Sequence, residues 1–284
     1  MRNDPDVQRV VDTFQLGLPR TPVAGRSGEL LGRGTGSSLE FQEFREYIPG
    51  DDIRHVDWSA YARSDTLMVR LYREEISPQT QILIDGSASM RTGGTVKPLV
   101  AKQLAAMFAL LCGRLGGRAG VVTLTDQVAT RTGLEGLDII QRLPFDSRAT
   151  MVDLLESNQV PLPRQSVRIV ISDFLFPHDP AALIRRLATG ASALWVLQLL
   201  NAWEADPTTS GGRRLVDIES AAETDLILDR KTIAGYQKRL QQLQAELARN
   251  CRRVHATFVP LIADKGLQTL CREDLCAAEV LRIA

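Results

Sequence analysis

From residue 79 onward, short apolar runs alternate with longer segments that repeat their apolar residues at helical spacing. Strand-like runs, rich in β-branched residues and bounded by polar or turn residues, occupy residues 79–85, 121–124, 167–173, 193–200 and 254–259. Helical spacing is found at residues 98–115, 137–143, 151–156, 181–187, 233–247 and 265–271. Strands that alternate with helices are typical of an α/β fold with a mainly parallel sheet.

Shorter patterns complete this expected sheet. Residues 128–132 favour a short antiparallel strand at one edge, and residues 204–214 form a loop by composition. Residues 215–218 and 225–229 follow as a predicted small hairpin at the sheet edge. Asp229 is expected to cap the helix after it, because its carboxylate can accept hydrogen bonds from the free N–H groups of the first turn.

The first 78 residues follow a different pattern. A short helix is predicted near Val7–Leu16, and a strand over residues 67–72, where apolar and polar residues alternate. The glycine-rich stretch Gly32–Ser38 lacks the lysine and hydroxyl that complete a phosphate-binding P-loop, so we predict a hairpin or loop there. We therefore expect two parts, a β-rich N-terminal segment over residues 1–78 and the α/β domain over residues 79–284.

Composition narrows the class of function. The chain has 284 residues, 44% hydrophobic and 24% charged, and its formal net charge is zero. These values are ordinary for a soluble globular protein and indicate neither nucleic acid nor a membrane surface as a partner. Residues 1–22 lack the features of a secretory signal, and the most apolar stretch, Leu104–Cys112, is too short to cross a bilayer. The four cysteines form no CxxC pair, which disfavours structural zinc and indicates reduced thiols, so we predict a cytoplasmic protein.

The strongest chemical signal follows the apolar run at residues 82–84. An acid and two hydroxyls, Asp85, Ser87 and Ser89, stand directly after this strand, at the edge where open parallel sheets bind ligands. They supply the hard oxygen ligands that Mg²⁺ or Mn²⁺ prefers. A second core strand also ends on an acid, Asp173. The sequence therefore predicts a divalent-metal site; the alternative is that Asp85 and both serines only cap the following loop and helix.

Catalysis is the less favoured interpretation. An aspartate that accepts a phosphoryl group usually has a second acid two residues later, where this chain has Ser87. No general base, GxSxG motif or Walker loop accompanies it. His55, Asp57 and Ser59 would share one face of a strand, but a hydrolytic triad normally assembles from distant segments. We expect a protein that is not an enzyme; a metal-dependent hydrolase or phosphotransferase is the alternative.

One segment of the chain is strongly basic. Residues 230–253 hold seven arginines and lysines against a single acid, Glu246. A solvated helix face is the usual explanation of such a segment, and we predict no nucleic-acid partner. Nucleic-acid binding through this helix is the third alternative, and its affinity would depend steeply on salt.

Two motifs together carry a family resemblance. From Arg45 to Trp58 the chain reads RxYxPGDDxRxxDW, followed by Ala62-Arg63 and Glu74-Glu75, and then by the DxSxSM sequence that begins at Asp85. This combination resembles the bacterial family known as domain of unknown function 58, from about Gly32 to the C-terminus. That family in turn resembles von Willebrand factor A-type domains from the DxSxS strand onward.

The resemblance implies a von Willebrand factor A-like fold: an open, mostly parallel sheet flanked by helices, with a metal-ion-dependent adhesion site. Such domains hold the ion with DxSxS, a threonine from a second loop and an acid from a third. The matching residues are Asp85, Ser87, Ser89, Thr150 and Asp173. Ala149 stands before Thr150, where these domains often have glycine, so Ser147 is the alternative ligand from the second loop.

The resemblance also implies a non-enzymatic adaptor that acts with a MoxR-type AAA+ ATPase in the maturation of other proteins or complexes. An acidic side chain of the partner would complete the metal shell. The block Arg45–Trp58 is expected to build an accessory face or a second contact surface. Many relatives carry membrane helices before this block; this sequence shows none there, so we expect no membrane insertion.

Overall fold

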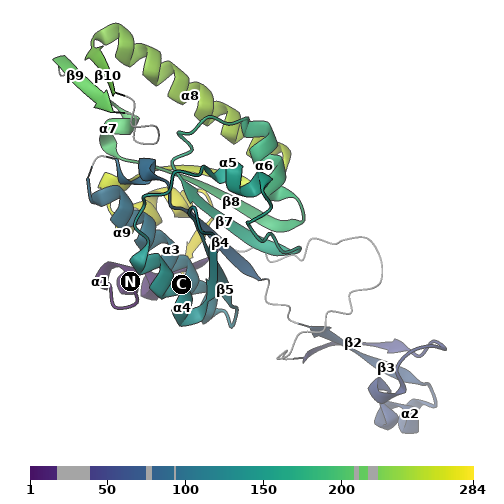
Figure 1. The fold of residues 1–284 in the computed structure, drawn as a ribbon. Helices are drawn as coiled ribbons and strands as arrows, with labels where there is room; N and C mark the ends of the chain where they lie inside the picture. Colours follow the sequence, from purple (N-terminus) through teal and green to yellow (C-terminus); the bar gives the residue numbers. More distant parts are fainter. Residues whose placement is uncertain (18–38, 75–78, 93, 208–210, 217–222) are drawn as a thin grey trace. The chain divides into compact units, whose positions relative to one another are not determined.

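The structure divides into two compact units. It is a computed structural model that describes residues 1–284 except 18–38, 75–78, 93, 208–210 and 217–222 (Figure 1). The first unit joins Met1–Val23 to Pro78–Ala284, and the second comprises Ala24–Ser77. The glycine-rich stretch Gly32–Ser38, for which the sequence predicts a loop, lies outside the described residues.

A six-stranded sheet forms the centre of the first unit. Its strands, in spatial order, are β11 (Thr257–Ile262), β8 (Ala191–Leu200), β7 (Ser166–Ser172), β4 (Thr80–Asp85), β5 (Ala119–Leu124) and β6 (Ala129–Thr132). All neighbours are parallel except β5 and β6. The expected α/β class, with a mostly parallel sheet flanked by helices and a short antiparallel edge strand, is therefore confirmed.

Helices cover both faces of this sheet, because alternate residues of a strand point to opposite sides. In β4, Ile82 and Ile84 belong to one buried apolar cluster and Leu83 to another. One face carries α1 (Pro5–Thr13), α3 (Val96–Arg114) and α4 (Gly133–Arg142), and the other carries α5 (Met151–Glu156), α6 (Pro180–Ala188) and α8 (Arg230–Arg253).

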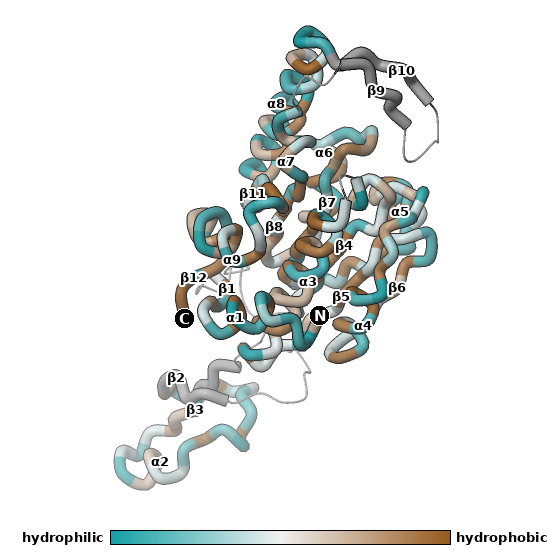
Figure 2. Tube along the Cα trace, turned by 90° about the vertical axis from the view of Figure 1, so that its left-hand side faces the viewer, coloured by the Kyte–Doolittle hydropathy of each residue, from teal (hydrophilic) through white to brown (hydrophobic). Residues whose placement is uncertain are grey.

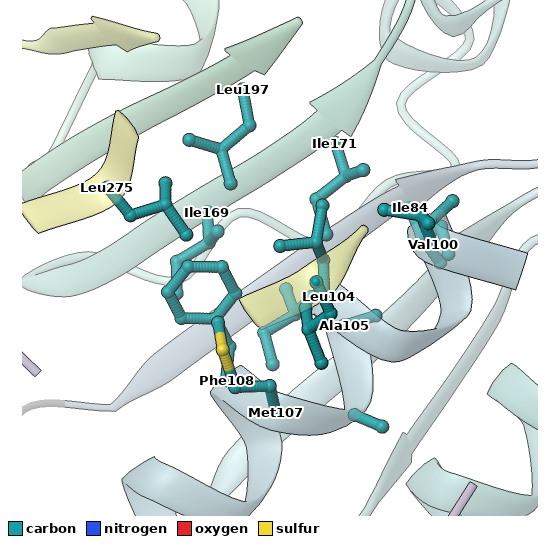
Figure 3. Close-up of a cluster of buried hydrophobic side chains, with 14 of the residues drawn as sticks. Ile84, Val100, Leu104, Ala105, Met107, Phe108, Ile169, Ile171, Leu197 and Leu275 are labelled. Atoms are coloured by element: carbon teal, nitrogen blue, oxygen red, sulfur yellow. The ribbon is translucent and has the colours of Figure 1, made fainter. Parts of the chain in front are cut away.

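Helix α3 is the central element of the first cluster. It is apolar on nearly all sides, as predicted, and Leu104 and Phe108 are fully buried. Figure 3 shows both side chains among Ile169 and Leu197 of the sheet. Within the described residues, α3 alone is long and apolar enough to cross a membrane by length and composition, and 61% of its most apolar 18-residue stretch is buried inside the unit.

The chain's first residues belong to the sheet-containing unit. Val7, Val10 and Val11 of α1 are buried in the first cluster, and β1 (Phe14–Leu16) pairs antiparallel with β12 (Leu281–Ile283). This placement corrects the expectation that residues 1–78 form one N-terminal segment. A strand of three residues carries little pattern of its own, and here its partner lies at the opposite end of the sequence.

The predicted hairpin after residue 214 is present, but it does not lie at the edge of the central sheet. Strands β9 (Gly211–Val216) and β10 (Glu223–Leu228) pair only with each other and are not part of the six-stranded sheet. The edge beside β8 is taken by β11, so the expected position at the sheet edge is wrong. The predicted loop over 204–214 is shorter than expected, because it contains the end of α7 (Ala202–Ala205) and the start of β9.

Helix α8 is longer than its apolar stripe indicated. It runs to Arg253, so the last parallel strand begins at Thr257 rather than near residue 254. Asp229 caps it as predicted, because its carboxylate accepts a hydrogen bond from the Thr232 N–H (2.7 Å). After β11, the short helix α9 (Leu267–Thr269) continues as a π-helical turn over Leu270–Leu275.

The second unit is small. Strand β2 (Leu39–Glu46) pairs antiparallel with β3 (Met68–Glu74), close to the strand predicted at residues 67–72. A 3₁₀ turn over Ile53–His55 and helix α2 (Trp58–Ser64) connect them. His55, Asp57 and Ser59 therefore do not alternate along a strand, as the hydrolytic triad would require.

Candidate functional site

The end of strand β4 delivers Asp85 to the carboxyl edge of the sheet. The strand lies between β5 and β7 and is buried along its whole length. The chain then turns at Gly86, whose N–H donates to the carbonyl oxygen of Leu124 (2.9 Å). A Cβ at Gly86 would lie 2.8 Å from that oxygen and 2.5 Å from Cγ2 of Thr125. This close approach requires glycine.

The structure brings Asp85, Ser87 and Ser89 together. Asp85 is 1% exposed, and its carboxylate oxygens accept hydrogen bonds from the Ser87 N–H (2.9 Å) and the Ser172 hydroxyl (2.6 Å). The hydroxyl oxygens of Ser87 and Ser89 are 3.0 Å apart. One carboxylate and two hydroxyls are thus gathered within a single turn of the chain.

Asp173 joins this group from the end of β7. It is fully buried, and one carboxylate oxygen accepts a hydrogen bond from the Leu175 N–H (3.0 Å). The other accepts from the Lys97 ammonium (2.8 Å). The negative charge of Asp173 acts on Asp85 strongly enough to contribute to its raised pKa. The two acids predicted from separate strand ends therefore share one buried site.

A buried lysine, which sequence reasoning missed, lies in the same cluster. The Lys97 ammonium, at the start of α3, donates to Asp173, to both carboxylate oxygens of Glu204 (2.9 Å each) and to the Ser89 carbonyl (3.1 Å). Its side chain is 0% exposed. Its position near the start of an apolar helix could have indicated burial. A buried lysine needs carboxylate partners, because burying an unpaired charge is costly.

Sequence reasoning also missed Glu204, although the spacing of Asn201 and Glu204 is that of a capping box. Asn201 and Glu204 form a capping box on α7: the Glu204 N–H donates to the Asn201 side chain (2.8 Å), and the Asn201 N–H donates to the Glu204 carboxylate (2.9 Å). Tyr236 of α8 donates its hydroxyl to the Glu204 carbonyl (2.7 Å). These contacts hold Glu204 against Lys97.

The buried charges do not balance. Three carboxylates, Asp85, Asp173 and Glu204, face a single ammonium. Burial, together with the charge of Asp173, raises the pKa of Asp85 to about 6, and burial also raises the pKa of Glu204. Burial acts to lower the pKa of Lys97, but its two carboxylate partners outweigh it and raise that pKa. With all four groups ionised, the cluster carries two excess negative charges and attracts a cation.

Thr150, the candidate ligand from the second loop, serves as a helix cap. Its hydroxyl donates to the Asp153 carboxylate (2.7 Å) and accepts from the Asp153 N–H (3.3 Å) at the start of α5. The Asp153 carboxylate also accepts from the Thr150 N–H, which completes a capping box. The Thr150 side chain makes its hydrogen bonds within this box and none to Asp85, Ser87, Ser89 or Asp173.

Ser147, the alternative ligand, lies directly beside Ser87 through its backbone. Its N–H donates to the Gly86 carbonyl (3.1 Å), and its carbonyl accepts from the Ala88 N–H (3.1 Å). Its hydroxyl donates to Asp126 (2.9 Å). Asp126 also accepts from the Arg148 and Ala149 N–H groups, so this acid, which the sequence analysis did not single out, shapes the second loop.

The residues present fit a hard divalent cation. Among the described residues, no group of three or more histidine, cysteine, aspartate or glutamate side chains could hold a metal ion. The donor set here is of another kind, because it combines two carboxylates with two serine hydroxyls, all oxygen. Oxygen ligands of this type suit Mg²⁺ or Mn²⁺ and exclude a thiolate or imidazole centre.

The acidic residues of the block Arg45–Trp58 stabilise its local structure. Asp51 pairs with Arg45 (2.8 Å), and Asp52 caps the 3₁₀ turn and pairs with Arg54, whose hydrogen bonds lower the pKa of Asp52 to about 2. Asp57 caps α2 and pairs with Arg70 (2.8 Å). Large apolar side chains in and beside this block are exposed, namely Ile48, Ile53, Trp58 and Tyr61.

The basic segment of α8 faces solvent. Ile233, Leu240 and Leu247 are buried, whereas all seven arginines and lysines of the helix are exposed. Figure 2 shows hydrophilic and hydrophobic positions alternating along α8 in the way expected of a helix with one packed side. The exposure of the cations agrees with a solvated helix face.

Comparison with known proteins identifies relatives of this chain. A family model described as protein of unknown function DUF58 matches residues 43–246. An uncharacterized protein of Mycobacterium tuberculosis is 25% identical over 276 residues, which cover 93% of this chain and 87% of the relative. A counterpart in Mycobacterium bovis matches to the same extent.

Two solved structures have a weaker likeness. The conserved hypothetical protein BatB from Bacteroides thetaiotaomicron aligns over 71% of this chain and 98% of its own, with 12% identity and a TM-score of 0.39. An aerotolerance-related membrane protein from Bacteroides fragilis aligns over 61% and 99%, with 13% identity and a TM-score of 0.35. At these TM-scores the likeness carries no conclusion about function.

Proposed function

Because this chain belongs to the protein family of unknown function DUF58, we propose its function from the site itself: a protein-interaction module that depends on a divalent cation. The observation that carries this proposal is the buried charge imbalance at the carboxyl edge of the sheet. Three buried carboxylates face one ammonium, beside two serine hydroxyls. A cation at this position would offset the excess charge and accept the oxygen ligands offered.

Asp85, Ser87, Ser89 and Asp173 would hold the ion, directly or through water, in a von Willebrand factor A-like arrangement. Thr150 or Ser147 would add a ligand from the second loop. When bound, Mg²⁺ or Mn²⁺ would supply an open coordination position for an acidic side chain of a partner protein. The carboxylate oxygens already accept hydrogen bonds from Ser172, Lys97 and two backbone N–H groups, which fixes their orientation before any ion binds.

The hydrogen bonds of the side chains around the site favour binding over catalysis. Lys97 is committed to acceptor atoms of three residues, and the Ser172 hydroxyl donates to Asp85. Neither is free to take a proton from a substrate. A metal-dependent hydrolase or phosphotransferase would need an additional base near this edge.

We propose a MoxR-type AAA+ ATPase as the partner, on the resemblance set out above. The second unit would supply a further contact surface, since Ile48, Ile53, Trp58 and Tyr61 expose apolar area there. Exposed aromatic residues of this kind are typical of protein interfaces.

A pull-down with and without EDTA tests this function. We expect a protein partner that is retained in the presence of Mg²⁺ and lost on chelation, and we expect Trp58→Ala to weaken its retention. Retention that is indifferent to EDTA would contradict the role of the ion. Turnover of a phosphate ester by the purified chain would favour the enzyme instead.

Removal of a single hydroxyl is expected to weaken the binding of the ion. In calorimetric titration with Mn²⁺, Ser87→Ala should lower the affinity at least about tenfold, which is about 1.4 kcal/mol, because one of few oxygen ligands is lost. Ser64→Ala is the matched control, because its hydroxyl lies in the second unit and donates only to the Ala60 carbonyl. Equal titrations of all three proteins would remove the metal hypothesis.

The ligand from the second loop can be identified by comparing two variants that break the same helix cap. Thr150→Ala and Asp153→Ala each disrupt the capping box, at a cost of about 1 kcal/mol in stability. Only Thr150→Ala removes the hydroxyl, so we expect it alone to weaken Mn²⁺ binding. If both variants bind normally, Ser147 replaces Thr150 in the proposal.

A further inference from the structure

A cavity lies at the opposite end of the strands from the candidate metal site. Its volume is about 460 Å³, and its walls include Arg164, Arg186, Thr189 and Gly190, with Val160 and Leu162 on the apolar side. Arg164 precedes β7, and Gly190 precedes β8, so the cavity opens at the amino edge of the sheet. Its size is within the range of small-molecule sites.

The cavity is cationic. Its lining contains two arginines and no acid, and neither arginine forms an ion pair within the part of the chain that the structure describes. Arg186 donates one N–H to the Asn158 side chain (2.5 Å), which orients its guanidinium and leaves other donors for a ligand. Two guanidinium groups in one cavity without a carboxylate favour an anionic ligand.

A third guanidinium lies directly behind the cavity wall. Arg168 is fully buried and donates to the carbonyl oxygens of Leu187 (2.5 Å), Thr189 (2.9 Å) and Pro163 (2.8 Å), and to the Ser166 hydroxyl (3.2 Å). Its partners are all uncharged, so its positive charge is not cancelled. It satisfies carbonyls at the C-terminus of α6, where the helix dipole would otherwise repel an anion.

A neighbouring cavity serves as an internal comparison. Its volume is about 400 Å³, and it shares Arg186 but also includes Glu156 and Asp179. Those two acids offset the shared arginine, so an anion has no preference for that cavity. The positive charge is therefore concentrated where Arg164, Arg186 and the buried Arg168 converge.

We propose that the cavity at the amino edge binds a phosphate monoester whose apolar or aromatic group rests on Val160 and Leu162. A phosphate group carries a charge between −1.5 and −2 near neutral pH, which matches two guanidinium groups backed by a third. The same chemistry is presented by a small phosphorylated metabolite and by a phosphorylated side chain of a protein. The site is independent of the metal-dependent function proposed above.

Phenyl phosphate is a suitable probe for the full-length chain. We expect saturable binding in calorimetry, with NMR shifts of the Thr189 and Gly190 amides. Arg164→Gln and Arg186→Gln should each weaken binding at least tenfold. Arg185→Gln is the matched control, because Arg185 neighbours Arg186 on the same helix and is likewise exposed but does not line the cavity. It should leave binding within twofold of the parent chain.

Several outcomes would overturn the site. Weakening of equal size in Arg185→Gln and Arg186→Gln would show a diffuse charge effect, and unshifted Thr189 and Gly190 amides would show binding elsewhere. Benzoate that binds as tightly as phenyl phosphate would contradict the phosphate class. A phosphotyrosine peptide that binds at least tenfold more tightly than phenyl phosphate would identify a phosphoprotein as the source, and equal affinities would identify a small molecule.

Discussion

Replacing Lys97 by methionine is expected to lower the free energy of unfolding by about 3–5 kcal/mol, the cost of removing one partner from a buried ion pair. Methionine fills a similar volume but leaves Asp173 and Glu204 buried without a counter-charge. Urea denaturation near neutral pH measures the loss. The loss should shrink at acid pH, because burial raises the pKa of Glu204 and its carboxyl group can then be protonated in the folded protein.

Two further variants separate this effect from the general cost of a mutation in α3. Lys102→Met is the matched control: Lys102 lies on the same helix, donates to the Gln141 carbonyl (2.9 Å) and stands over the Phe145 ring, and its loss should cost about 1 kcal/mol or less. Adding Glu204→Gln to Lys97→Met should recover part of the stability, because it removes one of the unpaired charges. Equal losses in Lys97→Met and Lys102→Met would contradict the ion cluster.

Replacing Asp85 by asparagine is expected to stabilise the metal-free protein while abolishing its response to Mg²⁺. The folded pKa of Asp85, about 6, lies above its ordinary value of 3.8. The unfolded state therefore binds fewer protons between these values, and stability falls as pH rises through this window. The full penalty above pH 6 is on the order of 3 kcal/mol, and asparagine avoids it because it carries no charge.

Urea denaturation over a pH series, with EDTA or with excess Mg²⁺, measures this effect. In the parent chain, Mg²⁺ should stabilise more above pH 6 than near pH 4, because protons compete with the ion for Asp85. Asp126→Asn is a control in which the expected pH dependence has the opposite sign. Hydrogen bonds from Ala149, Ser147 and Arg148 lower the pKa of Asp126, so the contribution of Asp126 to stability is lost as the pH falls below the ordinary range of an aspartate. If the parent chain and Asp85→Asn show the same dependence of stability on pH between about pH 4 and pH 6, the raised pKa of Asp85 is refuted.

The cluster around Lys97 also connects the candidate site to helices α7 and α8. Glu204 is held by the capping box of α7 and accepts at its carbonyl from Tyr236 of α8. Lys97 joins this helix pair to Asp173. The support of the candidate metal site therefore extends through buried hydrogen bonds to α8.

Local patterns in the sequence were sufficient for the elements that carry the predicted ligands. Asp85, Ser87, Ser89 and Asp173 follow short apolar strands, and a buried strand of this kind can be recognised from a few neighbouring residues. The cap at Asp229 was equally readable, because a capping contact spans three residues. The α/β class followed from the alternation of these elements.

Tertiary structure decided the rest, because it depends on contacts between distant residues. Lys97 meets Asp173 and Glu204 across 76 and 107 positions of the chain, and Ser172 meets Asp85 across 87. Residues 14–16 find their strand partner at the other terminus. No local pattern specifies such pairs, since apolar periodicity shows which residues are buried and not which of them meet. The sequence alone therefore determined which residues are the candidate oxygen ligands. Only the tertiary structure decided that a buried lysine lies among them and that the buried charges do not balance.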